Sequence, residues 1–186
     1  YLPPFKAAVE EGALTVMINS GVVNGIPGHM NHHLLTTVLK EEWGFEGFAV
    51  SDWEDLIMLH TVHRTAKTIK DGIVQAINAG LDMSMVPLAP QYKEYCSLLK
   101  EAVQDGSVST ERLDDAVRRI LRVKVILGLY EKNMNQKRAY PKFGSKQHQK
   151  LALDAAIESI TLLKNDGVLP LKKSQKILPN NNKPTL

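Results

Sequence analysis

The feature that most constrains the fold is an alternation of short apolar segments with longer amphipathic ones. The short apolar segments span residues 13–20, 47–51 and 81–87, and each precedes a segment with apolar residues at helical spacing. Strands that alternate with helices in this way are typical of parallel βαβ units. The short segments are apolar throughout, which predicts strands that are covered on both faces. We therefore expect an α/β fold with a parallel sheet.

Helical spacing of apolar residues predicts the elements that cover these strands. Gly80 suits a left-handed C-terminal cap of one predicted helix, and Ser109 suits the N-cap of another. Asn24-Gly25 and the polar stretch between residues 52 and 70 predict loops. The helices are expected at the end of a segment closed by Gly12, over 32–42, 71–79, 91–105 and 147–164, and after Ser109, where Arg118, Arg119 and Arg122 are interpreted as the solvated face.

The motifs distinguish a closed barrel from an open, doubly wound sheet. Neither G-x-G-x-x-G nor G-x-x-x-x-G-K follows any predicted strand, so a nucleotide-binding open sheet loses its main support. A (β/α)8 barrel takes about 250 residues and carries its chemistry where the strands end. About three βα units are visible here, and Ser20, Asp52 and Met85 lie at their strand ends. We predict the C-terminal half of a TIM-type (β/α)8 barrel.

Sequence character also predicts the domain boundaries. Residues 1–132 form the predicted barrel part, and the stretch NMNQKRAYPKFGS within 133–146 loses its periodicity, which indicates a linker. Residues 147–186 are expected to begin a second α/β sandwich-type domain. The chain opens without Met and closes on the polar stretch PNNNKPTL, so we expect it to be part of a longer protein.

Composition argues against several function classes. The formal charge is +3, with acidic and basic residues interspersed, which argues against a nucleic-acid partner. Cys96 is the only cysteine, and no apolar run approaches the ~20 residues that span a bilayer, so neither a disulfide framework nor a membrane segment is expected. The histidines lack fixed acidic or cysteine partners, and we interpret them as hydrogen-bonded loop or surface residues; no metal or cofactor is expected.

Asp52 and Trp53 are the residues best placed for chemistry. A carboxylate held at the end of a buried strand, beside an aromatic face, suits attack on the anomeric carbon of a sugar. The alternative is that Asp52 only caps the segment that follows. Glu54 and Asp55 are too close along the chain to act as its partner and are interpreted as loop acids.

Several motifs resemble glycoside hydrolase family 3, which includes β-glucosidases and exo-β-glucanases. The resemblance rests on NG-x-P near Asn24, LLT-x-VLK at 34–40 and WGF-x-GF-x-VSDW at 43–53. Further matches are AINAGLDMSMVP at 76–87, RLDDAVRRIL at 112–121 and ESITLLKNDGVLPL at 158–171. The similarity covers nearly the whole chain in the family's order.

The resemblance implies retaining hydrolysis of terminal β-D-glucosyl residues from a β-glucoside or β-glucan oligosaccharide. Asp52 takes the place of the nucleophile, and Trp53 that of a residue lining the glucosyl subsite. Ser20 stands where many relatives carry a tyrosine, and its hydroxyl could donate a hydrogen bond to Asp52.

The acid/base would come from outside this segment, so the missing barrel half and second domain are needed, and the isolated chain is expected to be inactive. Family members are often secreted or periplasmic, and the compartment stays open. The alternative is a non-catalytic fragment or pseudoenzyme that keeps only the fold and carbohydrate binding.

Overall fold

The computed structural model describes residues 1–88, 90–131 and 140–174, and the chain divides into two compact units, Tyr1–Asn135 and Gln136–Leu186. Residues 133–139, half of the linker predicted over 133–146, and residues 175–186 of the second domain predicted over 147–186 lie outside the described residues. The elements of the first unit are α1 (Leu2–Glu10), β1 (Thr15–Met17), β2 (Val22–Val23), β3 (Ile26–Pro27), η1 (Gly28–Met30), η2 (His33–Glu42), β4 (Phe48–Val50), α2 (Asp55–Thr61), α3 (Ile69–Ala79), α4 (Gln91–Gln104) and α5 (Thr110–Ile126).

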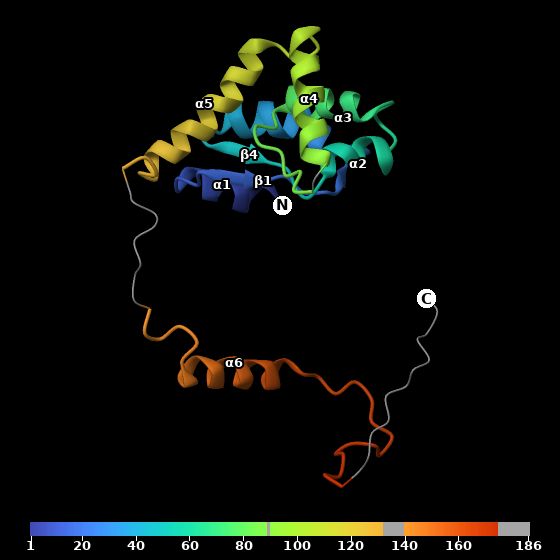
Figure 1. Cartoon of the computed structure of the whole chain (residues 1–186), viewed down its shortest axis with the longest axis vertical. Helices are drawn as coiled ribbons and strands as arrows, with labels where there is room; N and C mark the ends of the chain where they lie inside the picture. Colours follow the sequence, from blue (N-terminus) through green and yellow to red (C-terminus); the bar gives the residue numbers. More distant parts are fainter. Residues whose placement is uncertain (89, 132–139, 175–186) are drawn as a thin grey trace. The chain divides into compact units, whose positions relative to one another are not determined.

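A parallel strand pair lies at the centre of the first unit. β1 and β4 pair with Val16 opposite Ala49, and α5 packs against β4, above the strands in Figure 1. Residues 81–87 were expected to form a third strand, but only Met83 bridges β4, at Val50. The segment leaves the sheet because the Met85 N–H donates to the Ser51 hydroxyl at 2.7 Å instead of to a backbone carbonyl. The α/β class and the parallel pairing are therefore as predicted, but a single bridge at Met83 stands in place of the expected third strand.

Most predicted helices are present, and the loops hold two elements that were not expected. Asn24 and Gly25 have φ of 50° and 81° and join β2 to β3, as in the tight hairpin turns that favour Asn-Gly. The short helix α2 occupies part of the predicted polar loop. The segment predicted as helix 32–42 forms η2, a π-helix.

Tight packing between α2 and α3 fixes the loop that follows β4. Leu56 and Leu59 are fully buried, and a Cβ at Gly72 would lie only 2.5 Å from the Leu56 carbonyl oxygen. Only glycine at this position lets the two helices approach so closely. A capping box between Thr68 and Asp71 starts α3 and satisfies backbone N–H groups at its N-terminus.

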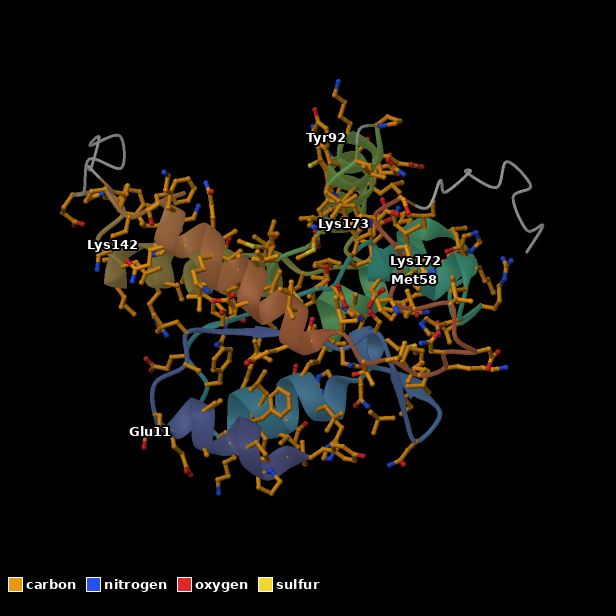
Figure 2. The ribbon with its side chains drawn as sticks, turned by 90° about the horizontal axis from the view of Figure 1, so that it is seen from below. Glu11, Met58, Tyr92, Lys142, Lys172 and Lys173 are labelled. Atoms are coloured by element: carbon orange, nitrogen blue, oxygen red, sulfur yellow. The ribbon has the colours of Figure 1, made fainter. Side chains whose placement is uncertain are left out.

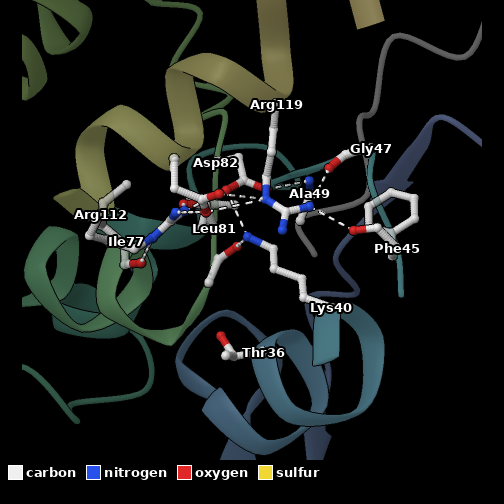
Figure 3. Close-up of polar contacts among 12 residues, drawn as sticks. Thr36, Lys40, Phe45, Gly47, Ala49, Ile77, Leu81, Asp82, Arg112 and Arg119 are labelled. Carbon is white, nitrogen blue, oxygen red and sulfur yellow. Dashed lines mark hydrogen bonds and ion pairs between the residues drawn. The ribbon is translucent and has the colours of Figure 1, made fainter. Parts of the chain in front are cut away.

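A buried carboxylate connects β4, η2 and α5 (Figure 3). Asp82 accepts hydrogen bonds from the Ala49 N–H at 2.9 Å, from Lys40 Nζ at 2.7 Å and from the Arg112 guanidinium. Arg119 was interpreted as part of a solvated helix face, which is wrong. Its side chain is only 17% exposed and donates to the carbonyl oxygens of Phe45, at 2.6 Å, and Gly47, at 3.0 Å.

The outer surface of the first unit carries solvated side chains. Glu11 directly after α1 and Tyr92 in the first turn of α4 point away from the ribbon (Figure 2), and Tyr92 is 44% exposed. Within the described ranges, no helix combines the length and apolar character needed to cross a bilayer.

The second unit contains one described helix, α6 (Lys146–Ser159), which ends five residues before the predicted limit at residue 164. Ser145 caps it by accepting a hydrogen bond from the His148 N–H. No strand is present in the described part of this unit, residues 140–174, so the sandwich-type second domain stays a prediction.

Candidate active site

Asp52 lies directly after β4, and both of its carboxylate oxygens accept a hydrogen bond. The Ser20 hydroxyl donates to Oδ2 at 3.1 Å, and the Trp53 backbone N–H donates to Oδ1 at 2.7 Å. Ser20 follows β1, 32 residues earlier in the chain, and parallel pairing of β1 with β4 brings the two strand ends together. The hydrogen bond expected between Ser20 and Asp52 is therefore present.

The loop that carries Asp52 is fixed at both ends to the neighbouring segment. The Ser51 N–H donates to the Met83 carbonyl at 2.9 Å, and the Glu54 N–H donates to the Met85 carbonyl at 3.0 Å. Ser51 is fully buried, and its hydroxyl also accepts the Met85 N–H. A carboxylate held by such a loop has little freedom to move, which is what attack in a fixed direction requires.

His29 contacts the backbone of Asp52 from a separate part of the chain. Its Nε2 accepts the Asp52 N–H at 3.1 Å, and its Nδ1 lies 3.2 Å from Asp55 Oδ2. Because Nε2 is an acceptor, the ring proton belongs on Nδ1, beside the Asp55 carboxylate. The 3.2 Å contact has ion-pair distance without hydrogen-bond geometry, so Asp55 Oδ2 is buried without a hydrogen-bond partner among the described residues. Burial lowers the pKa of His29 below its usual 6.5, while the Asp55 and Asp52 carboxylates act in the opposite direction.

Asp55 differs from the loop acid expected from the sequence. It is 2% exposed, like His29, and it is the first residue of α2, where the N-terminal end of the helix favours a negative charge. Neither residue was among the sequence-based site candidates. The sequence offers only the weak signal of an acid in a first helical turn, since the contact joins residues 26 positions apart.

Trp53 and Glu54 form the outer part of the turn. Trp53 is 52% exposed, so its ring is accessible beside the carboxylate. Glu54 has φ of 58°, a left-handed conformation that is uncommon outside glycine. Oε1 of Glu54 is buried without a hydrogen-bond partner among the described residues. Such backbone conformations often occur at functional sites, where the surrounding structure enforces them.

An apolar groove with a cavity volume of about 170 Å³ lies beside β1, and neither Asp52 nor Ser20 lines it. Leu2 and Phe5 of α1 line one part of it, together with Met17, Val23 and Trp43. Several of these side chains are more than 40% exposed, so the groove is an uncovered apolar surface and contains no charged group.

The described residues contain no group of three or more His, Cys, Asp or Glu side chains that could hold a metal ion. Two of the histidines already have protein partners. His29 is bound as described above, and Nδ1 of His60 lies 3.1 Å from the Ala66 carbonyl oxygen.

Comparison of the chain with known proteins identifies its family. Residues 1–123 match the glycosyl hydrolase family 3 N-terminal domain. The chain therefore belongs to glycosyl hydrolase family 3, as its motifs indicated.

Similar proteins include several β-glucosidases. The chain is 45% identical over 175 residues to a lysosomal beta glucosidase of Dictyostelium discoideum, covering 92% of this chain and 21% of that protein. It is 39% identical over 184 residues to a periplasmic beta-glucosidase of Salmonella typhimurium, covering 95% of this chain and 23% of that protein. A beta-glucosidase of Listeria innocua, solved in complex with glucose, is 34% identical with a TM-score of 0.71, covering 92% of this chain and 23% of that one. The chain thus spans about a fifth to a quarter of the length of these proteins.

Proposed function

We propose that this chain is part of a retaining β-glycosidase that removes terminal β-D-glucosyl, or related β-glycosyl, residues. The observation that carries the proposal is the hydrogen-bonded carboxylate of Asp52 at the end of β4, with the exposed Trp53 ring beside it. Family membership and the β-glucosidases and β-xylosidases among the similar proteins support the substrate class. The similar Listeria innocua beta-glucosidase has been solved with glucose, and a mutant of it with laminaribiose, which favours a β-glucoside or β-glucan oligosaccharide.

The proposed reaction has two steps. In the first, a carboxylate oxygen of Asp52 attacks the anomeric carbon, the bond to the leaving oxygen breaks, and a carboxylic acid outside this segment protonates that oxygen. In the second, water attacks the anomeric carbon, the ester to Asp52 breaks, and the water proton passes to the same acid/base. One water molecule is consumed, and the sugar keeps its configuration. Ser20 and the Trp53 N–H hold the carboxylate, and the Trp53 ring provides a face for the sugar.

We further propose that residues 1–132 belong to a (β/α)8 catalytic barrel and that 147–186 begin a second domain. The parallel β1–β4 pair, extended by the bridge to Met83, supports the barrel part. The exposed apolar groove beside β1 supports an arrangement in which further barrel elements cover that edge. The acid/base and the remaining sugar contacts would come from those elements and from the second domain.

Product stereochemistry tests the proposal. Intact protein containing this chain is mixed with an aryl β-D-glucoside, and the anomer of the released glucose is followed by proton NMR before mutarotation. We expect β-glucose first, and we expect Asp52→Ala to remove hydrolysis while the matched variant Asp114→Ala, on the exposed side of α5, retains it. Release of α-glucose, or full activity of Asp52→Ala, would contradict the proposal. Sugar binding without hydrolysis by the unmodified protein would instead indicate the non-catalytic alternative.

A further inference from the structure

The backbone N–H groups of the loop after β4 have separate partners. Those of Ser51 and Glu54 donate to Met83 and Met85 and fix the two ends of the loop. Between them, the Trp53 N–H donates to the Asp52 carboxylate within the loop, and the Asp52 N–H donates to His29 Nε2, which belongs to a different segment from Met83 and Met85. Because this N–H is partly buried and an unpaired backbone donor away from water is costly, the bond to His29 helps to orient the Asp52 backbone.

His29 is itself held in place from two sides. On one side, the Gly28 N–H donates to the Gly21 carbonyl at 2.9 Å, and a Cβ at Gly28 would lie 2.5 Å from the Asn19 carbonyl oxygen. The element η1 therefore lies directly on the loop that carries Ser20. On the other side, Asp55 faces Nδ1 from the first turn of α2. The imidazole contacts the Asp52 loop and α2, and η1, the element that carries it, lies against the Ser20 loop through Gly28.

The hydrogen bond between the Asp52 N–H and His29 forms in only one protonation state of the imidazole. Nε2 accepts the Asp52 N–H only when it carries no proton, and the Asp55 carboxylate favours the tautomer with the proton on Nδ1. A doubly protonated ring would place two donors against each other at Nε2.

We propose that His29 and Asp55 are positioning residues that set the direction of the Asp52 carboxylate for attack on the anomeric carbon. His29 acts on Asp52 through the backbone, and Asp55 acts through His29 by fixing the ring and its tautomer. This inference rests on the proposed function, because it assigns a role in the step that forms the glycosyl-enzyme ester. We call the hydrogen bond from the Asp52 N–H to His29 Nε2 the anchor. Its loss is expected to slow formation of the ester more than it weakens sugar binding, since a small misplacement of a reacting group can reduce the rate about 10²-fold.

Two substitutions of His29 distinguish the effect of its hydrogen bond to Asp52 from the effect of its packing. His29→Phe keeps a ring of similar size but has no acceptor for the Asp52 N–H. His29→Gln offers a side-chain carbonyl oxygen near the position of Nε2 and so can keep the hydrogen bond. His33→Phe, at an exposed histidine of η2, is the matched control. Far-UV circular dichroism and the melting temperature of each variant report whether it is folded.

The assay uses the intact enzyme and 2,4-dinitrophenyl 2-deoxy-2-fluoro-β-D-glucoside. Dinitrophenolate leaves without being protonated, so the rate constant of covalent capture at saturation reports attack by Asp52 without the acid/base. We expect His29→Phe to lower this rate constant about 10²-fold, with the half-saturating concentration nearly unchanged, and we expect His29→Gln to restore at least part of the loss. A rate constant for His29→Phe equal to that of His33→Phe would overturn the inference. So would a rate loss matched by an equal loss of sugar binding, or a folded His29→Gln no faster than His29→Phe.

A measurement on the unmodified protein covers the case in which His29→Phe does not fold. Nitrogen NMR of protein with ¹⁵N-labelled histidine is expected to show His29 near pH 7 with a proton on Nδ1 and none on Nε2, identified by loss of the signal in His29→Gln. A proton on Nε2 would overturn the inference without any activity measurement. If the unmodified protein is not captured at all, the proposed function fails, whereas the nitrogen spectrum still tests the anchor by itself.

Discussion

Replacement of Asp82 by Asn tests whether the buried carboxylate network stabilises the fold around the site. The Asp82 side chain is fully buried and accepts bonds from the Ala49 N–H, Lys40 and Arg112 (Figure 3). In either orientation of the Asn amide, its NH2 group faces at least one of these donors. Arg112 keeps Asp115 as a partner, but the Lys40 side chain is only 7% exposed and loses its counter-ion.

The expected loss follows from these contacts. Removing one partner of a buried ion pair costs about 3–5 kcal/mol, against a typical total free energy of unfolding of about 5–15 kcal/mol. The assay is urea unfolding of the intact protein, followed by far-UV circular dichroism, with the midpoint and slope compared between variants. Asp114→Asn is the control, because Asp114 is 55% exposed and lies 3.5 Å from Arg118, so no measurable change in its midpoint is expected.

The pH dependence of the loss makes the test sharper. Burial lowers the pKa of Lys40 below its usual 10.5, and Asp82 acts in the opposite direction. Without Asp82, the pKa of Lys40 in the folded state falls further. The pH range in which Lys40 is protonated in the unfolded state but neutral in the folded state therefore becomes wider. Stability rises with pH across that range, so the deficit of Asp82→Asn should narrow as the pH is raised from neutral toward the usual lysine pKa of 10.5. A loss below about 1 kcal/mol, or a deficit that grows with pH, would refute the reasoning.

Four further predictions follow from the site and the surface. Ser20→Ala should lower kcat/KM for an aryl β-glucoside about 10-fold, because a bond to a charged group contributes about 1.5–3 kcal/mol and water replaces part of it, whereas exposed Ser97→Ala should change nothing. Trp53→Ala should raise KM more than it lowers kcat, since the proposed subsite places the ring against the sugar before and during reaction; an unchanged KM would argue against the subsite. The pKa of His29 is lowered in the folded state, so as pH falls through about 6.5 the unfolded state binds a proton that the folded state does not. The free energy of unfolding of the wild type should therefore decrease there relative to that of His29→Gln, and an equal pH dependence of the two would contradict that shift. Residues 1–186 expressed alone should be associated or insoluble and inactive, since apolar side chains such as Phe5 and Met17 are exposed; light scattering from an active monomer would contradict this.

Elements with strong local signals could be predicted from the sequence. Ser109 begins α5 by accepting the Arg112 N–H, and Gly80 ends α3 with φ of 121°. Ser20 and Asp52 were both placed at strand ends, and parallel pairing brings them into hydrogen-bond contact. In these cases a few neighbouring residues are enough to predict where the helix or strand begins or ends.

Elements that depend on distant contacts could not be predicted. The helix α2 has no side-chain N-cap, and Glu54 before it has positive φ, so only the acid Asp55 in its first turn signals its start. Burial of Leu56 and Leu59 against α3 holds the helix instead. The contact between His29 and Asp55 joins residues whose proximity only the folded structure shows. The hairpin at Asn24-Gly25 did have a local signal, which was interpreted as an irregular loop.

Identification of the residue that forms the glycosyl-enzyme ester tests the central claim most directly. The intact protein is inactivated with a 2-deoxy-2-fluoro-β-D-glucoside, digested and mapped by tandem mass spectrometry. The account predicts one added fluoroglucosyl group on the peptide containing GFAVSDW, located at Asp52, and no labelling of Asp52→Ala. A label on another residue, or undiminished labelling of Asp52→Ala, would contradict it.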